Sequence, residues 1–260
     1  MEMSLAAERF EAYGTSHQGA ILVLLVGAMA LAWFGRAHRG SPAADRLGRA
    51  LTIAILLFTL PLQILYFTPA YWSFERTLPL NLCDLAWMVS AYALWTQRRW
   101  AVALTYFWGL TLTTQAIITP DLAAEFPDPV FFLFWGMHLL IVWAAVYLTW
   151  GLGLSPDWRS YRTAIFTTAV WAVSVFAFNL LLDTNYGYLN AKPASGSILD
   201  LLGPWPWYVA AEIGIIAAVW ALVTWPWVAL AGRRRARPRY SLSDEKPPQG
   251  SLRSRRYRLR

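Results

Sequence analysis

Apolar residues occur along this chain in seven long runs, and short polar segments separate them. The runs cover residues 18–36, 48–67, 78–97, 99–119, 129–151, 162–182 and 206–231. A helix rises about 1.5 Å per residue, so each run is long enough to cross the hydrocarbon core of a bilayer, about 30 Å thick. Backbone groups in lipid must be hydrogen-bonded within their own segment. The pattern therefore predicts an all-α polytopic membrane protein with seven transmembrane helices.

The composition agrees with this pattern. Apolar residues make up 57% of the 260 residues and charged residues only 14%, against about 25% charged in a soluble domain. There is no room for a soluble catalytic domain beside the helices. We expect a short outer segment at 1–17, the transmembrane domain at 18–231 and a basic, disordered tail at 232–260, which contains 11 of the 22 lysines and arginines.

Positive charges alternate between successive loops. Four arginines lie in or next to the loop after the first run, and two each in or next to the loops after the third and fifth runs, whereas the other three loops contain no more than one lysine or arginine. Cytoplasmic loops are the positive ones. The expected topology has the N-terminus outside and the C-terminus in the cytoplasm, in a bacterial plasma membrane. The basic tail is expected either only to fix this orientation or also to bind anionic lipid.

Polar side chains inside the runs gather toward the predicted outer side. A buried polar group in lipid needs a partner or a function. The residues on the runs are Gln63, Cys83, Gln115, His138, Asn179 and Glu212, with Asn81 and Asp84 beside the cysteine. We expect them to line one outward-facing polar cavity. The long loop 183–205, which contains Asn185 and Lys192, is expected either to cover that cavity as a lid or to be a plain solvated loop.

Cys83 is the only cysteine, so the chain has no internal disulfide and no cysteine-based metal cluster. With His138 it supplies the groups of thiol chemistry, a nucleophile and a base. The alternatives are a packing thiol and a histidine that bonds a neighbouring helix. No intramembrane lysine is available for retinal, no second buried histidine is expected for haem, and no metal-ligand spacing occurs. We expect no metal and no cofactor.

Several motifs resemble known families. Five of them are the segments 78–85, 106–121, 134–138, 185–186 and 203–208, together with Lys192 and Pro193. They resemble the bacterial YwaF-type integral membrane proteins over about residues 50–225. A more distant resemblance is to the eukaryotic transmembrane protein 164 family of acyltransferases, which implies a cysteine-bound acyl group on Cys83 and a catalytic role for His138. The androgen-induced-gene-type lipid hydrolases are also similar but use threonine as nucleophile.

The sequence therefore favours a lipid acyltransferase that acts through a Cys83 thioester on phospholipid or lysolipid. The acceptor can be a lipid or water, so an ester hydrolase stays open. A non-catalytic transporter or lipid-binding protein with the same cavity is the other alternative. The expected partners are membrane lipids, and no nucleic acid partner is expected.

Overall fold

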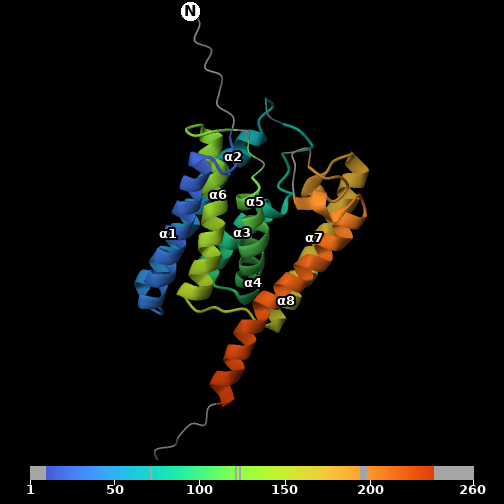
Figure 1. The fold of residues 1–260 in the computed structure, drawn as a ribbon. Helices are drawn as coiled ribbons and strands as arrows, with labels where there is room; N and C mark the ends of the chain where they lie inside the picture. Colours follow the sequence, from blue (N-terminus) through green and yellow to red (C-terminus); the bar gives the residue numbers. More distant parts are fainter. Residues whose placement is uncertain are drawn as a thin grey trace, which may run out of the picture.

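The computed structural model describes residues 10–70, 72–75, 77–120, 122, 124–193 and 198–236. All the regular elements in this part of the chain are helical (Figure 1). In chain order they are α1 (Thr15–Ala37), α2 (Pro42–Tyr66), α3 (Leu82–Thr96), α4 (Arg99–Phe107), η1 (Trp108–Leu112), α5 (Thr113–Ile118), α6 (Pro129–Val146), η2 (Tyr147–Gly151), α7 (Trp158–Leu182), η3 (Tyr186–Tyr188), η4 (Ile198–Leu202) and α8 (Trp207–Ala236).

Each predicted apolar run coincides with one of these helices or with a continuous stack of them. Six of the seven are long and apolar enough to cross a membrane, so the chain is an integral membrane protein that spans it several times. The exception is α3, which has 15 residues, or about 22 Å of helix. The structure thus supports six helical spans in the described residues, and the expected count of seven is not confirmed.

The helices form a bundle with two ends. We call the end where α1, α3 and α6 begin the upper end and the end where α3 turns into α4 the lower end (Figure 1). The continuous helix α4–η1–α5 and the helix α6–η2 lie at the centre, with 61% and 56% of their span residues buried. Helices α7 and α8 pack together at one edge, where only 11% are buried, so most of their surface faces lipid.

Small residues let α1 approach the central helices closely. A Cβ on Gly35 would lie 2.6 Å from the Cα of Gly151, and a Cβ on Gly27 would lie 2.2 Å from the Trp143 ring. Close backbone approach at glycine is a common device in membrane bundles, because it replaces the hydrophobic effect with tight packing. The first helix is therefore held against α6 and η2 along most of its length.

Helix α8 continues to Ala236, five residues beyond the expected end of the transmembrane domain. Residues 237–260, which form most of the basic tail, and residues 1–9 of the expected outer segment lie outside the described residues.

Candidate functional site

Cys83 is the second residue of α3, and its neighbours Asn81 and Asp84 fix the start of the helix. Asn81 precedes the first helical residue, and its backbone N–H donates to Asp84 Oδ2 at 3.1 Å. Asn81 and Asp84, the predicted polar neighbours of the cysteine, thus form one of the two hydrogen bonds of a capping box. Cys83 is half-buried. It shares one helix face with Trp87, Ser90 and Leu94, which are all buried.

His138 lies near the middle of α6 and is 3% exposed. Its Nδ1 lies 2.7 Å from the carbonyl oxygen of Phe134, one turn earlier on the same helix. A carbonyl oxygen can only accept a hydrogen bond, so Nδ1 is the protonated nitrogen of the neutral ring. Nε2 then has its lone pair free. This tautomer is the one a general base requires.

His17 shows how a structural histidine differs. It is fully buried on α1, its Nδ1 accepts from the N–H of Tyr13 at 2.8 Å, and its Nε2 donates to the carbonyl of Ile117 at 2.9 Å. Nδ1 therefore holds Tyr13, which precedes α1, and Nε2 holds α1 against α5. The sequence predicted no second buried histidine, and this prediction is wrong for His17, although both of its ring nitrogens have hydrogen-bond partners.

Cys83 and His138 lie at nearly the same depth in the bundle. Gly48 of α2 provides the reference, because a Cβ there would lie 3.2 Å from the Leu94 carbonyl oxygen and 3.9 Å from the Tyr147 ring. Cys83 is eleven residues above Leu94, or about 16 Å, and His138 is nine residues above Tyr147, or about 14 Å. The two groups therefore lie within about one helical turn of each other in depth.

The two side chains do not bond to each other directly. Within the residues that the structure describes, no hydrogen bond joins Cys83 to His138. His138 shares its helix face with Ile141 and Ala145, and these two pack against Gly109 of η1. The face that carries His138 is thus directed toward η1 and α5, while α3 also packs against both η1 and α6.

The predicted polar residue Gln63 and two aromatic side chains, those of Trp171 and Tyr186, hold the non-helical segment before α3. Gln63 Nε2 donates to the carbonyl of Thr77 at 2.9 Å, and Trp171 Nε1 donates to that of Leu80 at 2.9 Å. The hydroxyl of Tyr186 donates to the Phe74 carbonyl and accepts from the N–H of Leu78. Backbone groups that no helix satisfies are thus paired with side chains, which lipid surroundings require.

Asn179 organises the loop that follows α7. It is 1% exposed. Its amide N–H groups donate to the Tyr186 carbonyl and to Asn190 Oδ1, both at 2.9 Å, and its oxygen accepts from Thr184 Oγ1 and the N–H of Tyr186. Asn185 Oδ1 accepts from the N–H groups of residues 190 and 191. These two asparagines therefore shape the loop itself.

The loop reaches the start of α3. The N–H of Gly187 donates to Asn81 Oδ1 at 3.2 Å, and Tyr186 and Leu189 form an apolar cluster with Leu78 and Leu80. Gly187 has a φ of 68°, and a Cβ there would lie 2.6 Å from the Trp171 ring, so both its backbone and its surroundings favour glycine. The segment 186–189 thus packs over the residues that lead into Cys83.

Three other residues predicted to line the cavity are Gln115, Lys192 and Glu212. Gln115 on α5 donates to Thr119 Oγ1 at 3.0 Å. Lys192 Nζ lies 3.5 Å from Asp200 Oδ1 and 5.6 Å from the ring centre of Tyr208. Glu212 is half-buried on α8, one turn below Tyr208. Lys192 and Glu212 thus both lie beside Tyr208, whereas Gln115 bonds at the end of its own helix.

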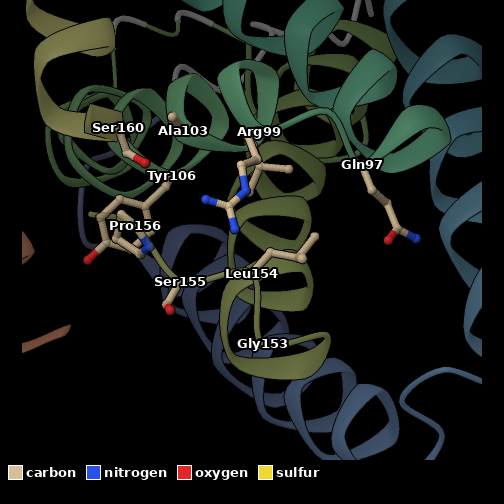
Figure 2. Close-up of a pocket in the computed structure, with 10 residues that line it drawn as sticks. Gln97, Arg99, Ala103, Tyr106, Gly153, Leu154, Ser155, Pro156 and Ser160 are labelled. Atoms are coloured by element: carbon tan, nitrogen blue, oxygen red, sulfur yellow. The ribbon is translucent and has the colours of Figure 1, made fainter. Parts of the chain in front are cut away.

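A cavity of about 140 Å³ opens at the lower end, away from Cys83. Its wall combines the turn after α3, the first turns of α4 and the segment between η2 and α7 (Figure 2). Arg99, Tyr106, Ser155 and Ser160 are among the residues that line it. No sequence pattern pointed to this cavity, because its parts come from three separate loops and helix ends.

A set of buried hydroxyl groups was not anticipated from the sequence. Their oxygens have no hydrogen-bond partner, and they belong to Ser90, Thr105, Thr113 and Thr149. Most buried threonines in membrane helices bond to the carbonyl four residues earlier, as Thr52, Thr59 and Thr224 do here. One sequence feature could have indicated part of this set: Thr105, Gly109 and Thr113 are spaced four residues apart along one helix.

Comparison with known proteins identifies the family. A model of the TMEM164 family matches residues 12–224. The chain belongs to the TMEM164 family. The match covers the helical bundle from α1 to Thr224 in α8, including the segments that contain Cys83 and His138. It does not confirm the resemblance to the YwaF-type group. No curated protein matches the chain, and no solved structure does.

Proposed function

We propose that this member of the TMEM164 family is a membrane-embedded lipid acyltransferase that works through a thioester on Cys83. The observation that carries the proposal is the similar depth of a half-buried thiol at a helix start and a buried histidine with a free Nε2. A cysteine that only packs would not need a histidine at its depth. A histidine that only joins helices would bond to another helix, as His17 does through Nε2, whereas the Nδ1 bond of His138 stays within α6.

The first step is attack on a phospholipid ester. His138 Nε2 accepts the thiol proton, and the thiolate of Cys83 attacks the ester carbonyl. Cys83 lies in the first turn of α3, where backbone N–H groups have no intrahelical acceptor and the helix dipole favours negative charge. These groups stabilise both the thiolate and the oxyanion. The C–O bond then breaks, and the lysolipid alkoxide takes the proton from His138.

The second step transfers the acyl group. The hydroxyl of a lysolipid loses its proton to Nε2 and attacks the thioester carbonyl, and the C–S bond breaks to return the thiol. Water in place of the lysolipid would give hydrolysis. The acyl chains would remain in apolar surroundings like those of the bilayer. Exposed apolar side chains of α7 and α8 provide these surroundings, such as those of Val173, Leu181 and Leu222. A transporter or lipid-binding protein would use the same groups without a covalent step.

We also propose that α3 crosses the membrane together with the non-helical residues before it, which makes seven crossings with the N-terminus outside a bacterial plasma membrane. The charge pattern supports this orientation. Reporter fusions at Glu75 and Arg98, before and after α3, test the crossing, and fusions at Glu125 and Arg239 test the orientation of the later helices. Each pair should give opposite signals, and equal signals at Glu75 and Arg98 would contradict a crossing by α3.

The single cysteine allows a direct test of the acyl-enzyme. Purified full-length protein is incubated with vesicles of phosphatidylethanolamine and phosphatidylglycerol, and its intact mass is measured before and after neutral hydroxylamine. Wild type should show a fatty-acyl mass that hydroxylamine removes, and Cys83→Ser should show none. The Ser variant differs by one atom, so its unfolding temperature serves as the fold control. Wild type without an acyl mass under all conditions would overturn the proposal.

A further inference from the structure

The cavity at the lower end takes no part in the proposed reaction, and its wall is well packed. Val102, Ala103 and Tyr106 line it from α4 and are at most 6% exposed. Pro156, which is also buried, lines it from the segment between η2 and α7. Its volume of about 140 Å³ is smaller than the roughly 300–1,000 Å³ of pockets that enclose a whole drug-sized ligand. The cavity is therefore sized for one small group, such as the head of a larger molecule.

Arg99 places a positive charge in this cavity. It is the first residue of α4, and its guanidinium group is directed toward the segment 153–156 on the opposite wall (Figure 2). In the part of the chain that the structure describes, this group has no hydrogen-bond or ion-pair partner. A guanidinium has five N–H donors and no acceptor, in a planar fork that matches carboxylate and phosphate oxygens. The free donors of Arg99 therefore suit an oxyanion.

Two nearby arginines differ from Arg99 because they already have partners. Arg39 donates from Nε and Nη2 to the carbonyl of Gly151, at 3.1 and 2.8 Å. Arg36 donates from Nε to the carbonyl of Trp150 at 3.1 Å. Both carbonyls belong to the end of η2, where a helix leaves its last carbonyl groups without intrahelical donors. These two arginines thus support the fold, whereas the charge of Arg99 has no such use.

The other polar groups of the cavity also favour an anion. Ser155 lines it, and its hydroxyl has no hydrogen-bond partner among the described residues, so it is free to donate beside Arg99. Asp157 is close enough for the charge of Arg99 to act on it, but it does not line the cavity. Its Oδ1 already accepts from the N–H and the hydroxyl of Ser160, at 2.8 and 2.9 Å. The cavity thus presents a cation and a hydroxyl donor, and the nearest carboxylate is engaged elsewhere.

The cavity lies at the depth of lipid headgroups. Trp100 and Trp158, at the starts of α4 and α7, flank it in the sequence and are 45% and 41% exposed. Exposed tryptophans at helix ends are typical of the membrane interface. In the proposed orientation this interface is the cytoplasmic one, where basic pockets between transmembrane helices bind the head groups of anionic lipids.

We propose that this cavity binds the phosphate group of an anionic phospholipid. The fork of Arg99 donates to two phosphate oxygens, and the hydroxyl of Ser155 donates to one of them. The headgroup has a net negative charge, because a zwitterionic headgroup would bring its own cation next to Arg99. The site goes beyond the proposed reaction and does not depend on it, since the lipid is held at the opposite end of the bundle from Cys83 and is not consumed.

Binding of dioctanoyl phosphatidylglycerol to the purified full-length protein, measured by isothermal titration calorimetry in a neutral detergent, tests the site. Wild type should bind this lipid about tenfold or more tightly than dioctanoyl phosphatidylcholine or inorganic phosphate. Arg99→Gln removes the charge and should weaken binding about tenfold or more, as expected for a lost hydrogen bond to a charged group. Ser155→Ala should weaken it about threefold. The unfolding temperature without lipid serves as the fold control, and Ser155→Ala keeps the test decisive if Arg99→Gln does not fold.

Arg98→Gln is the matched control. Arg98 directly precedes Arg99, is exposed and has the same charge, but it does not line the cavity. This variant should bind phosphatidylglycerol within about twofold of wild type. Equal weakening in Arg98→Gln and Arg99→Gln would mean that only diffuse surface charge attracts the lipid, and unchanged binding in Arg99→Gln would likewise overturn the site. Inorganic phosphate that binds as tightly as phosphatidylglycerol would reject a lipid as the ligand.

Discussion

His138 Nδ1 donates to the carbonyl of Phe134, at 2.7 Å and within the same helix. This bond fixes both the tautomer and the direction of the ring, because the donor and acceptor are one helical turn apart. It also means that the helix, and no charged partner, orients the base. Catalytic histidines in soluble enzymes are often oriented by a carboxylate. Here the supporting group is neutral, which avoids a second buried charge in lipid.

This bond leads to a prediction for His138→Asn. The asparagine amide N–H can replace Nδ1–H, but the side chain has no atom in the place of Nε2. The variant should fold normally, while acylation of Cys83 slows by about 10²-fold or more, as expected when a general base is lost. The measurement is the rate at which the acyl mass appears. His17→Asn should do the reverse, lowering the unfolding temperature without slowing acylation, and equal slowing in both would exclude a special role for His138.

The loop on the start of α3 gives a second prediction. Asn179→Ala leaves buried partners unpaired in the segment 184–190, and each such loss costs about 1–3 kcal/mol. Hydrogen exchange of residues 184–191 should become much faster, while α4 and α6 exchange as in wild type. Iodoacetamide should also reach Cys83 faster, because the loop packs over the residues before it. Uniformly faster exchange in all helices would instead mean that Asn179 supports the whole bundle.

The contact between α1 and η2 allows a third prediction. Gly35→Ala would bring a methyl group within 2.6 Å of the Gly151 Cα and force the two backbones apart. Overpacking of this kind typically costs about 1–3 kcal/mol. The unfolding temperature in detergent should fall by several degrees. Gly19→Ala, on the same helix with open space around it, should be neutral or slightly stabilising. A loss of stability in both variants would show that helix geometry, and not the close contact, was responsible.

The fourth prediction concerns Asp157, outside the membrane-spanning segments. Burial raises the pKa of this carboxyl, but hydrogen bonds from the Ser160 N–H and hydroxyl and the charge of Arg99 outweigh burial and lower the pKa below its ordinary value. A carboxyl with a lowered pKa stabilises the fold above its ordinary pKa, and that contribution is lost as the pH falls through the folded value.

Asp157 is the N-cap of α7, so Asp157→Ala should cost about 1 kcal/mol at pH 7. The difference in unfolding temperature between wild type and variant should shrink as the pH falls below 4, and Asp157→Asn should keep most of the stability at both pH values. If the difference in unfolding temperature stays constant down to pH 3, the charge of the Asp157 carboxylate does not contribute to stability.

The helices were predictable because membrane lipid imposes a simple rule on sequence. Apolar runs such as 99–119 and 129–151 coincide with the observed helices to within a residue. The third run was harder to interpret. Residues 78–81 are apolar enough to suggest helix, but Pro79 and the capping pair Asn81 and Asp84 start α3 at Leu82. The capping hydrogen bonds determined where α3 begins, and the average hydrophobicity of the run carries no information about such bonds.

The site was only partly predictable, and for a different reason. Cys83 and His138 stood out because such residues are rare in lipid. Gln63 and Asn179 stood out equally, yet they hold backbone and loop. A polar residue in a membrane helix indicates that some group nearby requires a hydrogen bond. The sequence does not show whether that group belongs to the backbone, to a loop or to a substrate. The unpaired hydroxyls of Thr105 and Thr113 were overlooked because a threonine hydroxyl usually bonds to a carbonyl of its own helix, and only the structure reveals that these two do not.

The non-helical segment before α3 also has a consequence for biosynthesis. Its backbone is paired with the side chains of Trp171 and Tyr186, which the ribosome adds about 100 residues later. At 5–20 residues per second, that delay is roughly 5–20 s. During this interval the first half of the chain has no means to complete its own fold in the membrane. The two halves of the protein must therefore finish folding together, with the start of α3 among the last parts to settle.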